Sequence, residues 1–242
     1  MKNKLQKIIE NKKASHVGMI LSFVIFISFL VFIFSIFGSP INFSQSNEPL
    51  LNHYQMKINE LFTSTITIIT ISPDNSLDKE CIKVDNSEFG LIDLNTIVKD
   101  KDSNIVDSKI SGDYLYFEWD SETFFKIYYS KKLEYKEDNI DTTDCYILSE
   151  DKISSFREDY YYDKSEILDF FSQYKANYTS LKSIVEIPAN NDFGLTFIDT
   201  YGNEIKTQEK EVQTNIYSKE IPIQYFDEYA QINSGFINIR IW

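Results

Sequence analysis

"TSTITIITIS", residues 63–72, is the stretch of this chain that decides its fold class. Eight of its ten residues are threonine or isoleucine. Side chains that branch at Cβ are restricted in a helix but fit the pleated surface of a sheet. The stretch therefore predicts a β-strand.

Working outward from it, the chain predicts many short strands. The segments that separate them are rich in turn-forming residues, as in "SPDNS", "DKDSN", "SGD" and "KEDN". Short strands at this spacing are typical of a sandwich or a small barrel. The expected strands are residues 80–84, 89–98, 113–119, 123–130, 143–148, 183–187, 193–199, 212–217 and the terminal "GFINIRIW".

Two helices are expected beside these strands. Residues 38–60 predict a polar stalk followed by an amphipathic helix, in which Pro49 occupies the first turn. A second helix is expected over residues 163–181, because Asp163 and Glu166 have the spacing of a capping box. The prediction is an α+β fold with a β-rich, sandwich-like domain and one or two packed helices.

Residues 17–37 contain no charged side chain, and as a helix they reach roughly 31 Å, about the thickness of a bilayer core. Residues 1–16 carry five lysines and one glutamate, whereas the remainder carries 19 Lys and Arg against 36 Asp and Glu. Positive charge beside a first span holds that end in the cytoplasm. The chain is therefore predicted to cross the membrane once through residues 17–37, with a cytoplasmic tail and an extracytoplasmic domain.

Residues 12–15, "KKAS", stand directly before this apolar stretch and resemble the class III signal of archaeal type IV pilin-like proteins. The resemblance implies cleavage between Ala14 and Ser15, after which the apolar helix stays with the mature protein. The chain departs from the family pattern at Met19, where a glutamate is usual, and at "GSP" (38–40), which ends the helix. Three forms remain open: an uncleaved anchor, which the long apolar core favours, pilin-like processing, and cleavage after Gly38.

The outer residues form one domain or two. Phe89-Gly90-Leu91 recurs as Phe193-Gly194-Leu195, within a longer series of matches at constant offset. This repeat suggests two related modules, 61–150 (β-rich) and 151–242 (α+β), although a chance match is also open.

The two cysteines, Cys81 and Cys145, both lie in the predicted extracytoplasmic part. That compartment permits a disulfide, and two free thiols are the alternative. Two sequons, at Asn42 and Asn177, are candidate glycosylation sites in the same compartment.

Catalytic and ligand motifs are not found in the sequence. The chain has 24 Lys and Arg, 37 Asp and Glu and two histidines, and its net charge of −13 argues against binding nucleic acid. Residues 100–111, "DKDSNIVDSKIS", begin like a calcium loop but lack its glycine and its final glutamate, so a solvated turn is expected. No catalytic residue, metal site or cofactor is predicted, and a structural role is expected for His53.

Aromatic residues supply the remaining functional signal, since the chain has 19 Phe and 16 Tyr. Tyr160, Tyr161 and Tyr162 lie in the charged stretch "EDYYYDK" and are the candidate interaction residues. Two functions are therefore expected. One is a structural or interaction role at the cell surface, through self-association or contact with other envelope proteins. The other is an accessory or sensory ectodomain for another membrane complex.

Overall fold

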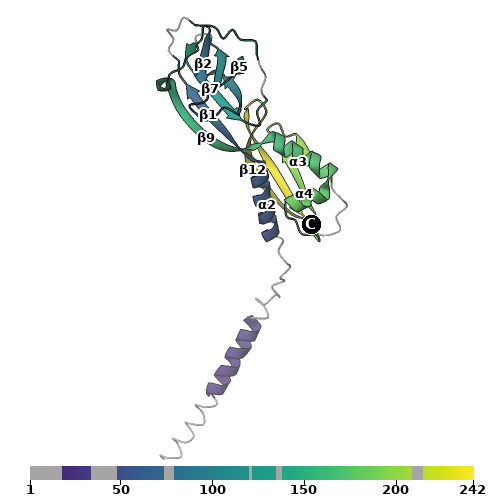
Figure 1. Ribbon diagram of the computed structural model, residues 1–242. Coiled ribbons are helices and arrows are strands. Elements are labelled where there is room, and N and C mark those ends of the chain that lie inside the picture. Colours follow the sequence, from purple (N-terminus) through teal and green to yellow (C-terminus); the bar gives the residue numbers. More distant parts are fainter. Residues whose placement is uncertain (1–17, 34–47, 74–78, 120–121, 135–137, 209–214) are drawn as a thin grey trace, which may run out of the picture. The chain divides into compact units, whose positions relative to one another are not determined.

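The computed structural model describes residues 18–33, 48–73, 79–119, 122–134, 138–208 and 215–242 (Figure 1). The chain divides into two units, Met1–Ser46 and Asn47–Trp242.

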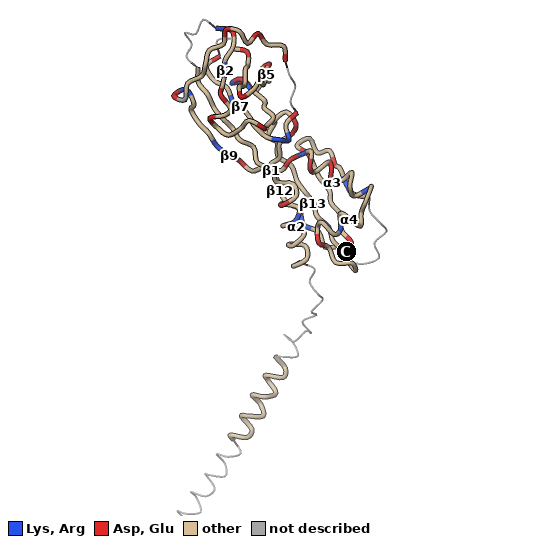
Figure 2. The backbone as a smooth tube through the Cα atoms, viewed as in Figure 1, with Lys and Arg blue, Asp and Glu red and all other residues tan. Residues whose placement is uncertain are grey.

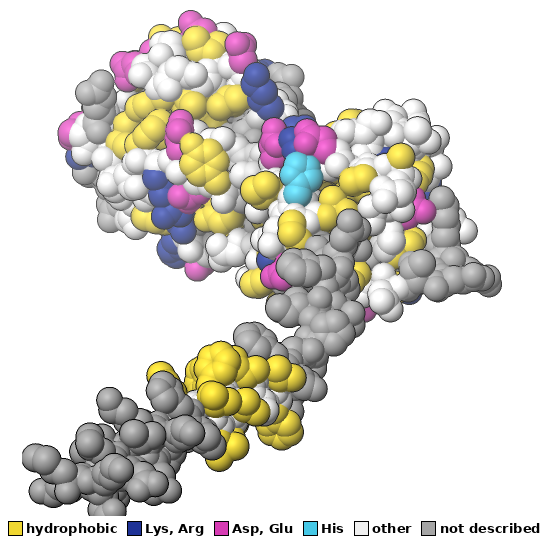
Figure 3. Space-filling model, turned by 90° about the horizontal axis from the view of Figure 1, so that it is seen from below, with side chains coloured by type: hydrophobic (Ala, Val, Ile, Leu, Met, Phe, Trp, Pro, Cys, Tyr) yellow, Lys and Arg dark blue, Asp and Glu magenta, His cyan; other side chains and the backbone are white. Residues whose placement is uncertain are grey.

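The first unit contains a helix over residues 18–33. Its apolar side chains, among them Met19, Phe23 and Phe29, are exposed, and Figure 2 shows no charged residue along it. Hydrophobic side chains cover the face of this helix seen in Figure 3. Among the described residues, no helix has the length and hydropathy of a membrane span. The predicted span 17–37 begins and ends outside the described residues and stays a prediction.

The second unit has two β-sheets and three α-helices among its described residues, and it confirms the α+β fold class. The larger sheet has the order β11-β10-β13-β12-β9-β1-β7-β3-β4, and the smaller has the order β5-β6-β2-β8. The larger sheet is built from β1 (Thr63–Ile71), β3 (Asn95–Lys99), β4 (Ile105–Val106), β7 (Phe125–Ser130), β9 (Ile153–Asp163), β10 (Phe193–Ile198), β11 (Glu204–Lys206), β12 (Tyr217–Phe226) and β13 (Ile232–Ile241). The smaller sheet is built from β2 (Cys81–Asp85), β5 (Ser108–Ser111), β6 (Tyr114–Glu118) and β8 (Tyr146–Ile147).

One hydrophobic core joins the three helices to one face of β10, β12 and β13. The helices are α2 (Glu48–Phe62), α3 (Lys164–Ala176) and α4 (Tyr178–Ile184), and they gather around the same part of the larger sheet (Figure 1). At the centre of this core, the ring of Phe193 contacts aromatic rings from every one of these helices. Helix α2, which was predicted within residues 38–60, therefore packs on the larger sheet.

A second core lies between the two sheets. Ile69 and Ile71 of β1, together with residues of β3 and β7 in the same sheet, pack against Ile82 of β2 and Phe117 of β6 in the smaller sheet. This two-layer packing agrees with the sandwich-like prediction. Strand β1 contributes buried side chains to both faces of the larger sheet, because Ile66 and Ile68 point into a separate cluster with Phe226 and Ala230.

The tip of the β12–β13 hairpin closes that third cluster. The Nζ of buried Lys99 donates to the carbonyl of Ala230 at 3.1 Å, and the N–H of Glu134 donates to the carbonyl of Glu228 at 2.9 Å. Burial lowers the pKa of Lys99.

Strands β9 and β1 pair over nine residue pairs, so the predicted modules 61–150 and 151–242 share one continuous sheet.

Several predicted elements are wrong. Residues 163–181 are two helices, because Asn177 ends α3 and caps α4. Residues 183–187 hold the end of α4 and a turn in place of a strand, with Glu186 at a positive φ of 58°. The repeated tripeptides also differ, since Phe89 and Gly90 lie in a turn whereas Phe193–Leu195 lies in β10.

Candidate functional site

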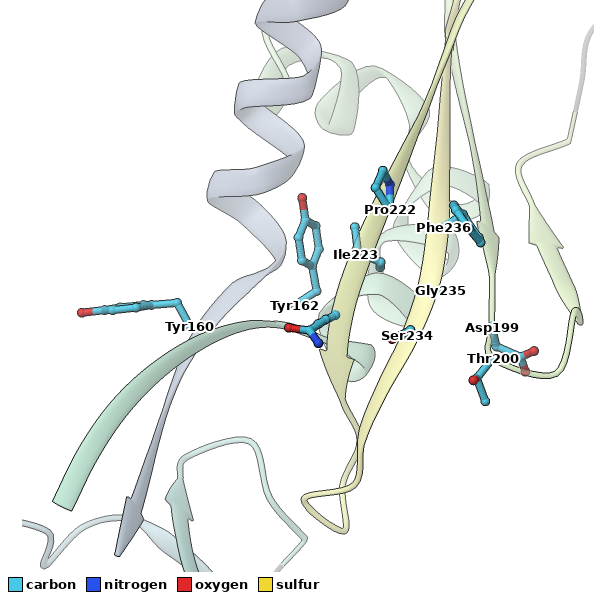
Figure 4. A pocket seen from close by; sticks show the side chains of 10 residues that line it. Tyr160, Tyr162, Asp199, Thr200, Pro222, Ile223, Ser234, Gly235 and Phe236 are labelled. Carbon is cyan, nitrogen blue, oxygen red and sulfur yellow. The ribbon is translucent and has the colours of Figure 1, made fainter. Parts of the chain in front are cut away.

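A groove of about 640 Å³ lies where β9 meets the β12–β13 hairpin. Its lining residues come from β9, β12, β13 and the turn after β10, as Figure 4 shows. They are Tyr160, Tyr162, Asp199, Thr200, Pro222, Ile223, Gln224, Ser234, Gly235 and Phe236.

Alternation along the strands places exposed side chains at this groove. Pro222 and Gln224 are exposed, whereas Ile223 between them is buried in the helix-covered core. Phe236 is 43% exposed and follows buried Gly235. The groove therefore presents apolar surface on a part of the sheet that the described helices leave open.

Gly235 is required at this point by close packing of the backbone. A Cβ atom built on it would lie 2.5 Å from the carbonyl oxygen of Ile198 and 3.1 Å from the Tyr225 ring. Because the nearer atom belongs to the backbone, a larger residue would have to push β10 away from β13. The glycine thus sets how closely the groove's strands approach.

The three candidate tyrosines do not share one face of β9, and their interaction role stays a prediction. Tyr160 is 69% exposed and lines the groove. Tyr162 donates its hydroxyl to Oδ1 of Asn59 on α2, and burial raises its pKa. Tyr161 lies on the opposite side of β9, packs against the third cluster and donates to Oδ2 of Asp159 at 3.3 Å.

Asp199 forms the groove's polar end. Its carboxylate accepts hydrogen bonds from residues of the turn that follows β10. Oδ1 accepts the backbone N–H groups of Tyr201 and Asn203, both at 2.8 Å, and Oδ2 accepts the Asn203 side-chain amide at 2.9 Å. The Asn203 hydrogen bonds hold the pKa of Asp199 below its usual range. The carboxylate therefore shapes the wall of the groove.

A turn of the same type occurs at Asp100, in the sequence that begins like a calcium loop. The Oδ1 of Asp100 accepts the N–H groups of Asp102 and Asn104, and Ser103 has a positive φ, as Gly202 has in the Asp199 turn. The expected solvated turn is found at residues 100–104, whereas residues 105–106 and 108–111 are the strands β4 and β5. No group of three metal-ligating side chains occurs among the residues that the structure describes.

Asp199→Ala is expected to lower stability at neutral pH. A carboxyl group whose folded-state pKa is depressed stabilises the fold above its unfolded pKa, and this contribution is lost as the pH falls through the folded pKa. The difference between variant and wild type should therefore shrink below the ordinary carboxyl value of about pH 3.9. Denaturant midpoints measured against pH check this. Tyr201→Ala is the control, because only the backbone of Tyr201 serves the turn; a pH-independent difference would contradict the prediction.

Cys81 and Cys145 form a disulfide, with Cα atoms 4.7 Å apart, as the sequence led us to expect. The bond stands beside the parallel pairing of β2 and β8, in which Ile82 lies opposite Tyr146. It therefore fixes a strand of only two residues to the smaller sheet.

The structure places one of the two sequons. Asn177 is exposed between α3 and α4, and its Oδ1 accepts the N–H of Ser180 at 3.2 Å. Asn42 and the processing residues Ala14 and Ser15 lie outside the described residues. His53 on α2 lies 3.2 Å from the carboxylate of Glu186, which also pairs with Lys57 at 2.8 Å, so these contacts join α2 to the turn after α4.

No protein-family model, curated protein or solved structure matches this chain. The groove itself offers aromatic rings, a proline, hydroxyl groups and the Gln224 amide. Aromatic side chains with polar neighbours suit non-covalent recognition, since they provide large contact area with few rotatable bonds. The sequence contained the aromatic signal, but residues 199–200, 222–224 and 234–236 carried no motif that could have predicted the groove.

Proposed function

We propose that this chain is a single-pass membrane-anchored protein that works by non-covalent contact at the outer face of the cell. Residues 17–37 would lie in the bilayer, with residues 1–16 in the cytoplasm. The lysine-rich flank, the uncharged stretch and the exposed apolar side chains of the helix at 18–33 support this topology.

The groove beside β9 is the observation that carries the contact role. Tyr160 and Phe236 are both large side chains exposed at its lining, with Pro222 between them in the sheet order. Exposed aromatic residues of this kind are the common anchors of protein interfaces. The proposed partner is another envelope protein or a second copy of this chain.

A pilin-like subunit is the more specific form of this proposal, and it rests on "KKAS" at residues 12–15. The mass of the mature N-terminal peptide tests it. A start at Ser15 supports the pilin-like form, whereas an intact N-terminus supports a plain anchor.

Phe236→Ser is expected to weaken partner capture by roughly tenfold or more, the effect of losing an aromatic anchor. The full chain is treated in intact cells with a crosslinker that does not cross the membrane, and crosslinked species are quantified. Tyr201→Ser is the matched control, because Tyr201 is 86% exposed and does not line the groove.

The outcomes of this experiment are distinct. A chain that reacts with the reagent but forms no complex contradicts the contact role. A chain that the reagent does not reach contradicts the proposed topology. Equal capture of Phe236→Ser and wild type removes the groove as the contact surface.

A further inference from the structure

Strand β9 has one edge that no described strand covers along most of its length. One edge pairs with β1 from Thr63 to Ile71, and the other pairs with β12 only at Tyr162 and Asp163. Residues 154–158 are exposed, and Figure 1 shows β9 as a long curved strand at the outside of this unit. Such an edge presents backbone groups that can pair with another strand.

The contacts of β1 show which residues of β9 present these groups. The carbonyl of Thr65 accepts a hydrogen bond from Ser130 of β7, so it points away from β9. Since backbone direction alternates along a strand, Ile66 and Ile68 point toward β9, and their partners Asp159 and Arg157 point back. The N–H and C=O groups of Phe156, Glu158 and Tyr160 therefore point out from the free edge.

The side chains on this edge complement themselves in one antiparallel arrangement. A two-fold axis that is perpendicular to the sheet and passes midway between the two copies of Glu158 keeps like faces together. It places Arg157 opposite Asp159 of the second copy, and Phe156 opposite Tyr160 of the second copy. Each pair occurs twice, and both opposite charges and aromatic pairs stabilise neighbouring strands.

The neighbouring registers that preserve the faces lack this match. Centring on Arg157 sets two arginines opposite each other, and centring on Asp159 sets two aspartates opposite each other. The Glu158-centred register has one like-charge contact, between the two copies of Glu158, against two Arg–Asp and two Phe–Tyr pairs. The charges on this edge therefore select a register, in addition to discouraging unspecific pairing.

We propose that the free edge of β9 is a homophilic contact, in which two copies of this chain pair antiparallel through residues 156–160, centred on Glu158. Tyr160 also lines the groove, but the inference concerns the backbone edge of β9, and its cysteine test does not use the groove residues of β12 and β13. Association of the apolar segments could bring two copies together but would not set this register.

Glu158→Cys in the full chain, solubilised in detergent, tests the contact. Opposed residues that exchange both backbone hydrogen bonds have Cα atoms about 5.5 Å apart, within the range that a disulfide bridges. Cys81 and Cys145 already pair with each other, so the new thiol is free to link two copies. We expect a disulfide-linked dimer on a non-reducing gel after mild oxidation.

Ser154→Cys is the matched control, since Ser154 is also exposed but would lie about 27 Å from its counterpart in this register. Phe156→Cys and Tyr160→Cys chains, which retain Glu158, should link only when the two are mixed. Arg157→Asp should reduce the mixed link, and the exchange Arg157→Asp with Asp159→Arg should restore it. A monomeric Glu158→Cys chain, or equal linking of Ser154→Cys, overturns the proposal.

Discussion

Replacing Cys81 and Cys145 with alanine is expected to lower the free energy of unfolding by about 4 kcal/mol. The bond closes a loop between residues 64 positions apart, so its loss enlarges the conformational freedom of the unfolded chain. Cys81 is also buried beside the core between the two sheets, where Ile82 and Phe117 pack. Alanine is used in place of serine because the hydroxyl group of serine would be buried there without a hydrogen-bond partner.

Fluorescence of the two tryptophans during denaturation of the full chain in detergent provides the measurement. Trp119 lies in the core between the sheets, and Trp242 lies against Gly194 in the helix-covered half, so each half has a reporter. Wild type treated with a reductant should lose the same stability, and the alanine variant should not respond to the reductant. A loss below about 1 kcal/mol would show that the two-residue pairing of β8 with β2 holds this region without the bond.

Phe193→Ala is expected to cost about 3–5 kcal/mol, the range for removing a large aromatic side chain from a core. Phe193 is fully buried, and its ring centroid lies 5.2 Å from that of Tyr54, 5.4 Å from that of Tyr174 and 5.3 Å from that of Tyr178. These rings belong to α2, α3 and the start of α4, so the cavity would loosen all three helices on the sheet.

Phe236→Ala is the matched control for this prediction. Phe236 lies on the neighbouring strand β13, but its side chain is exposed, so its removal should change stability by no more than about 0.5–1 kcal/mol. Denaturant unfolding compares both variants with wild type. Equal losses in the two variants would contradict the central packing role of Phe193.

Local sequence patterns predicted the elements whose burial is periodic. Strand β1 was recognised from its β-branched residues, and α2 from apolar residues that recur on one helical face. In β13, Ile237, Ile239 and Ile241 alternate with exposed or half-buried residues, as expected. The sequence shows this regular spacing of apolar residues because one face of each element packs against a core.

Strands β9 and β12 were not predicted, and both border the groove. Much of β9 is exposed on both faces, so the stretch that contains Arg157, Glu158 and Asp159 has no apolar alternation. Strand β12 contains Pro222, which normally argues against a strand, but its free edge accommodates a residue without an N–H group.

The sequence by itself determined the α+β class, the apolar stretch near the N-terminus and the candidate disulfide, because each depends on composition or on short-range periodicity. Only the tertiary structure decided that Tyr161 faces away from Tyr160 and Tyr162, and that Phe236 and Asp199 join Tyr160 at one groove. These arrangements depend on pairings between distant strands, in which a shift of one residue reverses the face of every side chain. The β9 edge belongs to the same class, since a strand's free edge is defined by the neighbours that it lacks.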